Sequence, residues 1–170
     1  MENFKNRLTR VKAFIFDVDG VLTDGSVTLL PDGEQVRMMN IKDGYALQLA
    51  VKKGYRIAVI SGGKSEMVRK RLNGLGITDI YLGSHTKMDQ YTDLLALYDL
   101  RPEEILYMGD DIPDYEVMRQ VGVPTCPKDS APEIKNISWG ITAYLDLKDA
   151  TTNGMIIAQG GLNGGWALYL

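Results

Sequence analysis

The sequence predicts an α/β fold with a doubly wound parallel sheet, similar in plan to the Rossmann fold. Short apolar runs rich in β-branched and aromatic residues alternate with stretches whose apolar residues recur at helical spacing. This alternation indicates repeated right-handed βαβ units, which build a parallel sheet. The 170 residues favour one domain over residues 1–170, and no linker or internal repeat divides them.

Strands and helices are predicted in turn along the chain. Residues 11–16 form a short apolar run before Asp17, and its length and composition favour a buried strand over a helix. Apolar residues at helical spacing over residues 44–53 predict the first helix, which ends at Gly54. The elements that follow are a strand at 56–60, a helix at 65–72 capped by Ser65, a strand at 79–82, a helix at 88–98, a strand at 104–108 and a helix at 112–121.

A β-hairpin is predicted over residues 26–39, because two apolar arms flank turn-forming residues at 31–33. If the turn keeps register, one face of the hairpin is apolar, and that face either covers a neighbouring chain or packs on its own core. The residues of this face are Val27, Leu29, Val36 and Met38. Residues 137–170 are predicted to be a loop-rich tail, since the alternation fades there and glycines become frequent.

Composition excludes several classes of function. The formal net charge is −3 with scattered Lys and Arg, so nothing indicates binding to nucleic acid or to an acidic membrane surface. No run approaches the roughly 20 apolar residues of a membrane helix, and residues 1–12 lack the apolar core of a signal peptide. The single cysteine, Cys126, excludes an internal disulfide and fits a reducing compartment. We therefore expect a cytoplasmic protein.

Polar side chains gather where the predicted strands end. In an open parallel sheet, ligands bind in the crevice beyond the carboxyl ends of the strands, so these side chains are candidates for a site. They come from four segments of the chain: Asp17 and Asp19 after the first strand, Ser61 after the second, Lys87 at a helix start, and Asp110, Asp111 and Asp114 after the strand at 104–108. Carboxylates are the ligands that Mg²⁺ prefers, usually together with phosphate oxygens, and a metal ion would relieve their mutual repulsion.

These residue types suit phosphoryl transfer. An ionised Asp17 could attack phosphorus and form an aspartyl-phosphate, which divides one hard displacement into two easier ones. Asp19 could protonate the leaving oxygen and then activate water. Ser61 could donate a hydrogen bond to the phosphoryl oxygens, and Lys87 could offset their charge.

The ordered set resembles the haloacid dehalogenase superfamily. Its motifs match residues 17–24, Ser61, Lys87 and residues 109–114, and the resemblance covers residues 11–135. The resemblance implies that Asp17 is the nucleophile and Asp19 the acid/base. It also implies Mg²⁺ bound by the Asp17 side chain, the Asp19 main-chain carbonyl and Asp110, with Asp111 and Asp114 supporting the metal shell.

A closer resemblance is to the 3-deoxy-D-manno-octulosonate 8-phosphate phosphatase family. It rests on residues 23–25, the hairpin after them, and residues 40–44, which read NIKDG. It implies a phosphorylated sugar acid as substrate, a role in lipopolysaccharide precursor synthesis, no cap domain, and a homotetramer in which a neighbour's hairpin and tail cover the site. The substrate contacts that it implies are Asp19, Asn40, Ile41, Lys42, Asp43, Gly44, Gln48, Arg71 and Lys87.

Two departures from the family pattern leave the substrate open. Gly63 stands where the family commonly has arginine, and no Arg or Lys follows Lys148 in the glycine-rich tail. A nine-carbon sugar acid 9-phosphate is therefore a second candidate substrate. A mutase, a phosphatase of nucleotides or small metabolites, and a non-catalytic regulatory domain are rival functions. A phosphoacceptor receiver domain would share the acidic strand ends, but Asp19 disfavours it.

Overall fold

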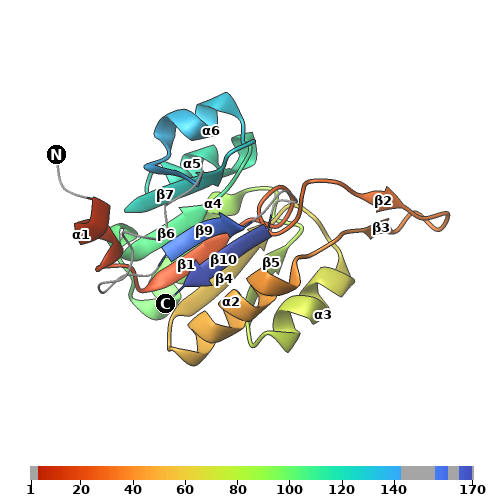
Figure 1. The fold of residues 1–170 in the computed structure, drawn as a ribbon, viewed down its shortest axis with the longest axis horizontal. Helices are drawn as coiled ribbons and strands as arrows, with labels where there is room; N and C mark the ends of the chain where they lie inside the picture. Colours follow the sequence, from red (N-terminus) through yellow and green to blue (C-terminus); the bar gives the residue numbers. More distant parts are fainter. Residues whose placement is uncertain (1–3, 143–155, 161–164, 170) are drawn as a thin grey trace.

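A six-stranded parallel sheet forms the centre of the computed structural model, which describes residues 4–142, 156–160 and 165–169 (Figure 1). The strands lie in the order β5 (Asp79–Leu82), β4 (Arg56–Ser61), β1 (Ala13–Phe16), β6 (Ile105–Met108), β7 (Val123–Pro127) and β8 (Gly140–Thr142). In β1, Ala13 pairs with Arg56 on one side and with Ile105 on the other. The chain therefore builds outward from β1 in one direction and then in the other. This is the strand order of the Rossmann fold and confirms the predicted fold class.

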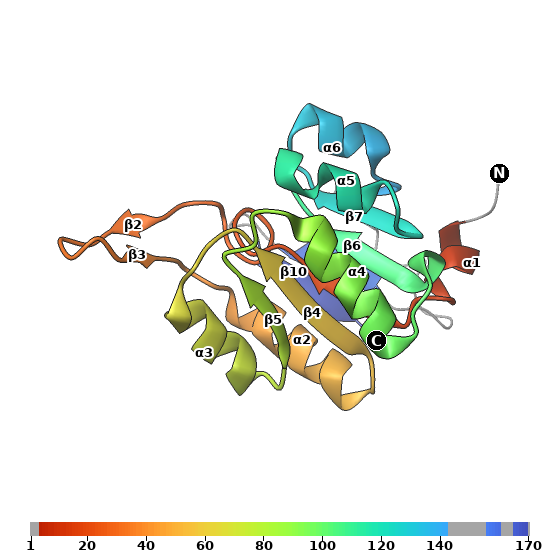
Figure 2. The ribbon, with the colours of Figure 1, turned by 180° about the vertical axis from the view of Figure 1, so that it is seen from behind.

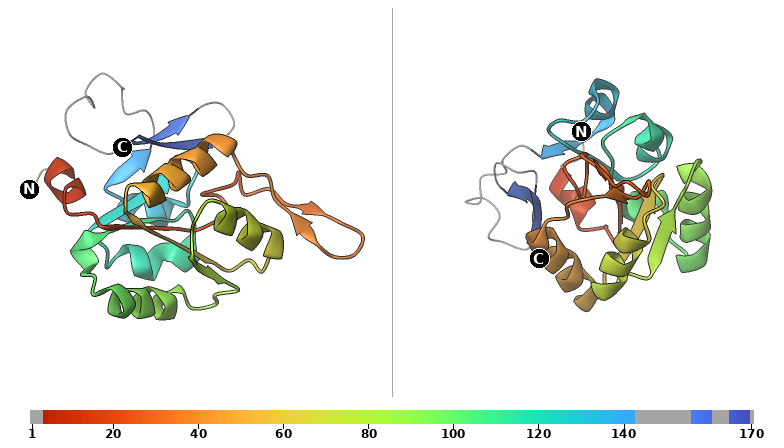
Figure 3. Two further views of the ribbon diagram at one scale, coloured as in Figure 1. Left: turned by 90° about the horizontal axis from the view of Figure 1, so that it is seen from below. Right: turned by 90° about the vertical axis from the view of Figure 1, so that its right-hand side faces the viewer.

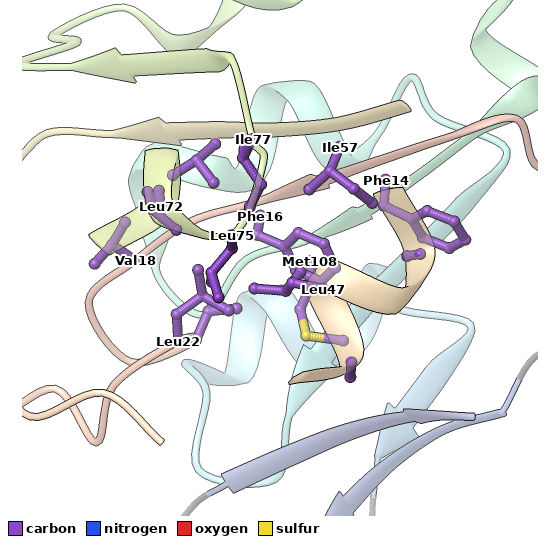
Figure 4. Close-up of a cluster of buried hydrophobic side chains, with 14 of the residues drawn as sticks. Phe14, Phe16, Val18, Leu22, Leu47, Ile57, Leu72, Leu75, Ile77 and Met108 are labelled. Atoms are coloured by element: carbon purple, nitrogen blue, oxygen red, sulfur yellow. The ribbon is translucent and has the colours of Figure 1, made fainter. Parts of the chain in front are cut away.

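Helices cover both faces of the sheet (Figures 1 and 2). α2 (Ile41–Lys52) and α3 (Glu66–Gly74) pack on one face, where Phe14 and Phe16 join their apolar residues (Figure 4). α4 (Lys87–Tyr98), α5 (Tyr115–Met118) and α6 (Pro132–Ile137) pack on the other face, which receives Ala13 and Ile15. Because β1 alternates its side chains between two covered faces, all four of its residues are buried.

Short elements complete the chain. α1 (Phe4–Leu8) precedes the sheet, and the 3₁₀ helices η1 (Pro102–Glu104) and η2 (Ile112–Asp114) flank β6. No helix among the described residues combines the length and the apolar character needed to cross a membrane.

The predicted hairpin forms an arm that projects from the body of the molecule (Figures 1 and 3). Its strands are β2 (Thr28–Leu29) and β3 (Gln35–Val36), and Gly33 has the positive φ, 85°, that the turn requires. Thr28 lies opposite Val36, and Leu29 lies opposite Gln35. Residues opposite one another point to the same side, so Leu29 and Val36 lie on different faces. The expectation of one apolar face is wrong, because the turn shifts the register by one residue. Nor do the arm's apolar side chains pack on the core, since Leu29 is 70% exposed.

The C-terminal third differs from the prediction. β7 was not predicted, because Pro124 and Pro127 remove two backbone donors from a five-residue strand. The expected helix at 112–121 is instead η2 followed by the four-residue α5. Within the tail expected to be loop-rich, the described residues form β8 and the antiparallel pair β9 (Ile156–Gly160) and β10 (Gly165–Tyr169). β10 lies against α2 (Figure 3). The rest of the tail, at 143–155, 161–164 and 170, lies outside the described residues.

The first helix begins three residues earlier than predicted, because Asn40 caps it. The Asn40 side chain accepts a hydrogen bond from the Lys42 amide at 2.8 Å. We expect Asn40→Ala to lower the free energy of unfolding by about 1 kcal/mol, the usual value of such a cap. Asn40→Ser should keep most of the stability, since serine caps as well as asparagine. Urea unfolding measures both.

Thr86 provides the control for this substitution. It occupies the same position before α4, but its side chain makes no capping hydrogen bond. Thr86→Ala should therefore leave the free energy of unfolding nearly unchanged. Equal losses from Asn40→Ala and Thr86→Ala would contradict the capping role.

Candidate active site

A cleft of about 510 Å³ lies at the carboxyl ends of the central strands. It lies beyond β1, β4 and β6, at the point where the strand order reverses, as expected for a doubly wound sheet. Its lining comes from the segments that follow these strands and from the start of α4. The lining residues are Asp17, Asp19, Gly20, Gly25, Ser61, Gly62, Gly63, Ser84, His85, Lys87, Asp110, Asp111 and Pro113. The fold thus brings all four predicted segments to one cleft.

A buried ammonium group lies at the base of the cleft. Lys87 Nζ is 2.9 Å from Asp17 Oδ2 and 2.6 Å from Asp114 Oδ1. Asp114 is fully buried, and its Oδ1 also accepts a hydrogen bond from the Tyr107 hydroxyl at 2.6 Å. Lys87 therefore fixes the positions of two carboxylates that come from different strand ends. It is the first residue of α4, so the start of that helix aims the ammonium group into the cleft.

The carboxylates of the cleft are crowded and poorly hydrated. Burial raises the pKa of Asp17 to about 6, and the charge of Asp114 adds to the effect while Lys87 opposes it. Burial, followed by the charges of Asp17 and Asp114, raises the pKa of Asp110 to about 7. Burial alone would lower the pKa of Lys87, but the charges of Asp17 and Asp114 raise it above its ordinary value. Lys87 therefore stays protonated, but its single positive charge does not offset the charges of the carboxylates around it.

The carboxylate cluster fits a divalent cation. Asp17, Asp110 and Asp114 each offer an oxygen, and these oxygens lie within 4.8 Å of one another. Hard oxygen ligands suit Mg²⁺, and a cation there would lower the raised pKa values of Asp17 and Asp110. Asp114 was expected to support the metal shell without binding the metal directly. Its Oδ1 already accepts hydrogen bonds from Lys87 and Tyr107, which favours that supporting role. Asp17 and Asp110 remain the better candidates for direct ligands.

Two glycines make the cluster possible. Gly20 has φ +79°, and a Cβ there would overlap the Asp110 carboxylate. A Cβ on Gly109 would overlap the Asp114 side chain. Gly20 thus lets the loop after β1 approach the loop after β6, and Gly109 makes room for the Asp114 side chain within that second loop.

The second predicted aspartate has a partner that the sequence did not indicate. Asp19 pairs with Arg37 at the base of the arm, with Arg37 Nε 2.5 Å from Oδ1 and Nη2 2.9 Å from Oδ2. Gly63 lies beside this pair, and its amide donates to Ser61 Oγ at 3.2 Å. The predicted acid/base residue, the predicted hydroxyl donor and the arm thus meet on one side of the cleft.

Several predicted residues lie outside the lining of the cleft. Asn40 caps α2, and the residues after it, Ile41 and Lys42, are exposed, whereas Asp43 and Gly44 are buried. Gln48 accepts from Lys52 Nζ on the surface of α2, and the Arg71 guanidinium packs against Gly44. Asp111 lines the cleft but is exposed, and its Oδ1 accepts from the Ile112 amide. The structure therefore gathers the predicted catalytic and metal residues, but not the seven predicted substrate contacts on α2 and α3.

Three further residues of the site were missed. Thr23 organises the loop after β1, since its hydroxyl accepts from the Gly20 and Gly25 amides and donates to the Val18 carbonyl. Its place inside the matched motif could have indicated this. Tyr107 and His85 had no comparable signal, because an isolated aromatic residue in a strand usually serves only to fill the core, and a lone histidine seldom belongs to a site.

Comparisons with known proteins agree with this geometry. Residues 40–122 match the family of haloacid dehalogenase-like hydrolases. The chain is 33% identical over 160 residues to the 3-deoxy-D-manno-octulosonate 8-phosphate phosphatase of Escherichia coli K12, covering 90% of this chain and 83% of that protein. It is 36% identical over 126 residues to the Yersinia pestis protein of the same name, covering 74% of this chain and 67% of that protein.

A solved structure is also similar. The Moraxella catarrhalis 3-deoxy-D-manno-octulosonate 8-phosphate phosphatase, in complex with a magnesium ion, a phosphate ion and a KDO molecule, superimposes with a TM-score of 0.79. It is 29% identical, and the match covers 82% of this chain and 80% of that one. Cleft, sequence and fold lead to the same assignment. The chain belongs to the 3-deoxy-D-manno-octulosonate 8-phosphate phosphatase family of haloacid dehalogenase-like hydrolases.

Proposed function

We propose that the chain is a Mg²⁺-dependent phosphatase that releases phosphate from 3-deoxy-D-manno-octulosonate 8-phosphate. The observation that carries the proposal is the buried Asp17 carboxylate, which lines the cleft while its Oδ2 is held 2.9 Å from Lys87 Nζ. A carboxylate in this position is oriented for attack and shielded from bulk water. The names of the relatives support the substrate, and the complex from Moraxella catarrhalis supports the metal ion.

Each residue of the cleft has a task in this reaction. Asp17 Oδ1 accepts from the Val18 amide at 2.7 Å, and together with the Lys87 contact this leaves the carboxylate one orientation toward the cleft. Attack on phosphorus forms an aspartyl-phosphate on Asp17 and expels the sugar oxygen. Asp19 protonates that oxygen. It then takes a proton from the water that attacks the phosphorus of the aspartyl-phosphate, which breaks the bond to Asp17, releases phosphate and restores the Asp17 carboxylate. Ser61 and Lys87 hold the phosphoryl oxygens. Asp17, Asp110 and the Asp19 carbonyl would hold Mg²⁺, which neutralises charge on the phosphoryl group.

The same proposal includes the cell compartment and the pathway. We place the enzyme in the cytoplasm and its product in lipopolysaccharide precursor synthesis, because the relatives' named substrate is a sugar acid phosphate. Recovery of the phosphatase activity with the membrane fraction would contradict the location.

Release of phosphate from the eight-carbon 8-phosphate, compared with its nine-carbon 9-phosphate analogue, tests the function. We expect a higher kcat/KM for the eight-carbon ester and no turnover with Asp17→Asn, whose amide is nearly isosteric but cannot attack phosphorus. Asp99→Asn is the matched control. It lies at the far end of α4 with φ 49°, a conformation that asparagine tolerates, and it should keep full activity.

The outcomes separate the candidate functions. A preference for the nine-carbon ester would move the proposal to that substrate. A folded protein that releases phosphate from no ester in the presence of Mg²⁺ would favour the non-catalytic regulatory domain. Residual turnover by Asp17→Asn above about a hundredth of the wild-type rate would contradict the nucleophile, since losing the attacking group removes the covalent route.

We also propose a homotetramer in which the arm contacts a neighbouring chain. The arm exposes Leu29 and Met38, the latter 82% exposed, and nothing in the described part of the same chain covers them. Light scattering should give the mass of a tetramer, and Leu29→Glu should lower that mass by placing a charge in an apolar contact. The control is Leu97→Glu, an exposed leucine on α4. A fully active monomer would contradict the shared site.

A further inference from the structure

Arg37 is the one residue of the arm that reaches the candidate active site. Its neighbours from Asp24 to Gln35 are exposed, yet its own side chain is only 6% exposed. Its Nε and Nη2 contact the Asp19 carboxylate at 2.5 and 2.9 Å, and its Nη1 donates to the Gln35 carbonyl at 3.1 Å. Burying a guanidinium is costly unless it is paired, so this contact fixes where the side chain lies.

The Arg37 guanidinium lies close to Gly63, where the absence of a side chain provides space for it. A Cβ on Gly63 would lie 3.2 Å from Arg37 Nη2, 3.5 Å from Asp19 Oδ2 and 3.6 Å from Ser61 Oγ. The small volume beside residue 63 is therefore bordered by a guanidinium, a carboxylate and a hydroxyl, and a side chain there would crowd the guanidinium. Asp19, Ser61 and Gly63 all line the cleft, so Arg37 lies directly behind its wall.

Acidic side chains outnumber basic ones in the cleft, so a second cationic side chain would help it to bind an anion. Among the described residues that line it, Asp17, Asp19, Asp110 and Asp111 are acidic, and Lys87 is the sole lysine or arginine. Lys87 already contacts Asp17 and Asp114, so the phosphoryl oxygens would share its single charge with two carboxylates. A phosphate monoester brings further negative charge to this acidic cleft, and a guanidinium fork matches a phosphate or carboxylate group in two parallel hydrogen bonds.

The pair of Arg37 with Asp19 can be exchanged only for another pair. The buried guanidinium needs an anionic partner, and an incoming anion would supply one, while the Asp19 side chain, which is 36% exposed, can be hydrated when the guanidinium leaves it. As long as the fork covers both oxygens of Asp19, that carboxylate is poorly placed to pass protons to a leaving group. An incoming anion that took over the fork would leave Asp19 free for that task.

From this geometry we propose that Arg37 is an anion-binding residue of the site. Without substrate it pairs with Asp19, and on binding it turns to the charged group of the substrate, either the phosphate or the sugar-acid carboxylate. This inference rests on the proposed phosphatase function, but only in naming the anions that the site receives.

Calorimetric titration of the Mg²⁺-loaded protein tests the inference without turnover. Inorganic phosphate and unphosphorylated 3-deoxy-D-manno-octulosonate are titrated separately into the wild type, Arg37→Gln and Arg37→Lys. We expect Arg37→Gln to weaken one of these affinities by about 10- to 100-fold, the value of a charged hydrogen-bonding group, and Arg37→Lys to lie between it and the wild type. The ligand affected identifies which group Arg37 contacts. With a phosphate ester as substrate, KM should rise more than kcat falls.

Two further variants keep the test decisive. Arg101→Gln removes an arginine that also pairs with a carboxylate, Glu104 at 3.0 Å, but before β6 rather than at the cleft, and it should leave both affinities unchanged. Gly63→Ala should crowd and shift the guanidinium slightly, and it should weaken the same affinity by less than Arg37→Gln, even if Arg37→Gln folds poorly. Unchanged affinities in Arg37→Gln and Gly63→Ala, with or without loss of thermal stability, would overturn the proposal and leave Arg37 as a tether for the arm. Because the titrations use no ester, they remain informative if the proposed substrate is wrong.

Discussion

The buried Lys87 ammonium group is the interaction on which the site depends. It contacts Asp17 and Asp114, which come from the ends of β1 and β6, and it begins α4 from a third segment. Without a cation between them, carboxylates this close and this buried would repel one another or take up protons. Tyr107 supports the arrangement from below, because burial and the charge of Asp114 raise its pKa well above 10 and keep it a neutral donor.

Lys87 alone does not balance the charges, and this deficit explains much of the surrounding structure. Burial, followed by the charges of neighbouring carboxylates, still raises the pKa of Asp17 to about 6 and that of Asp110 to about 7, so a further cation nearby would stabilise both carboxylates. Gly20 allows the loop after β1 to approach Asp110 closely enough for one divalent cation to serve both acidic loops, and Gly109 makes room for the Asp114 side chain within its own loop. Gly63 in turn admits the Arg37 guanidinium beside Asp19. At each of these three positions, the absence of a side chain leaves room for a charged group of the site.

Much of this could be predicted from the sequence, because the strongest signals are local. The apolar runs before Asp17, Ser61 and Asp110 marked three central strands, and the rule that parallel strands present their carboxyl ends at one edge then placed those residues together. The contacts that were missed are long-range. The pairing of Arg37 with Asp19 depends on the path of an arm 18 residues further along the chain, and β7 was hidden by its two prolines. The prediction of one apolar face on the arm was wrong, because a one-residue register shift places Leu29 and Val36 on different faces. The expected substrate contacts on α2 and α3 lie outside the lining of the cleft.

The most direct test is the stability of the metal-free protein as a function of pH. The folded-state pKa values of Asp17 and Asp110, about 6 and about 7, exceed their ordinary value of 3.8. The folded state therefore holds more protons than the unfolded state between about pH 4 and 7, and the free energy of unfolding should fall as pH rises through that range. The depressed pKa of Glu104, about 2, affects stability below this range, and the raised pKa of Lys87 affects it above the range.

Mg²⁺ should restore the stability that is lost as pH rises, and its effect should be larger at higher pH. Asp110→Asn should flatten the profile and weaken the effect of Mg²⁺. Stability that is constant or rises over this range, together with no effect of Mg²⁺ at neutral pH, would contradict a crowded carboxylate site that needs a cation.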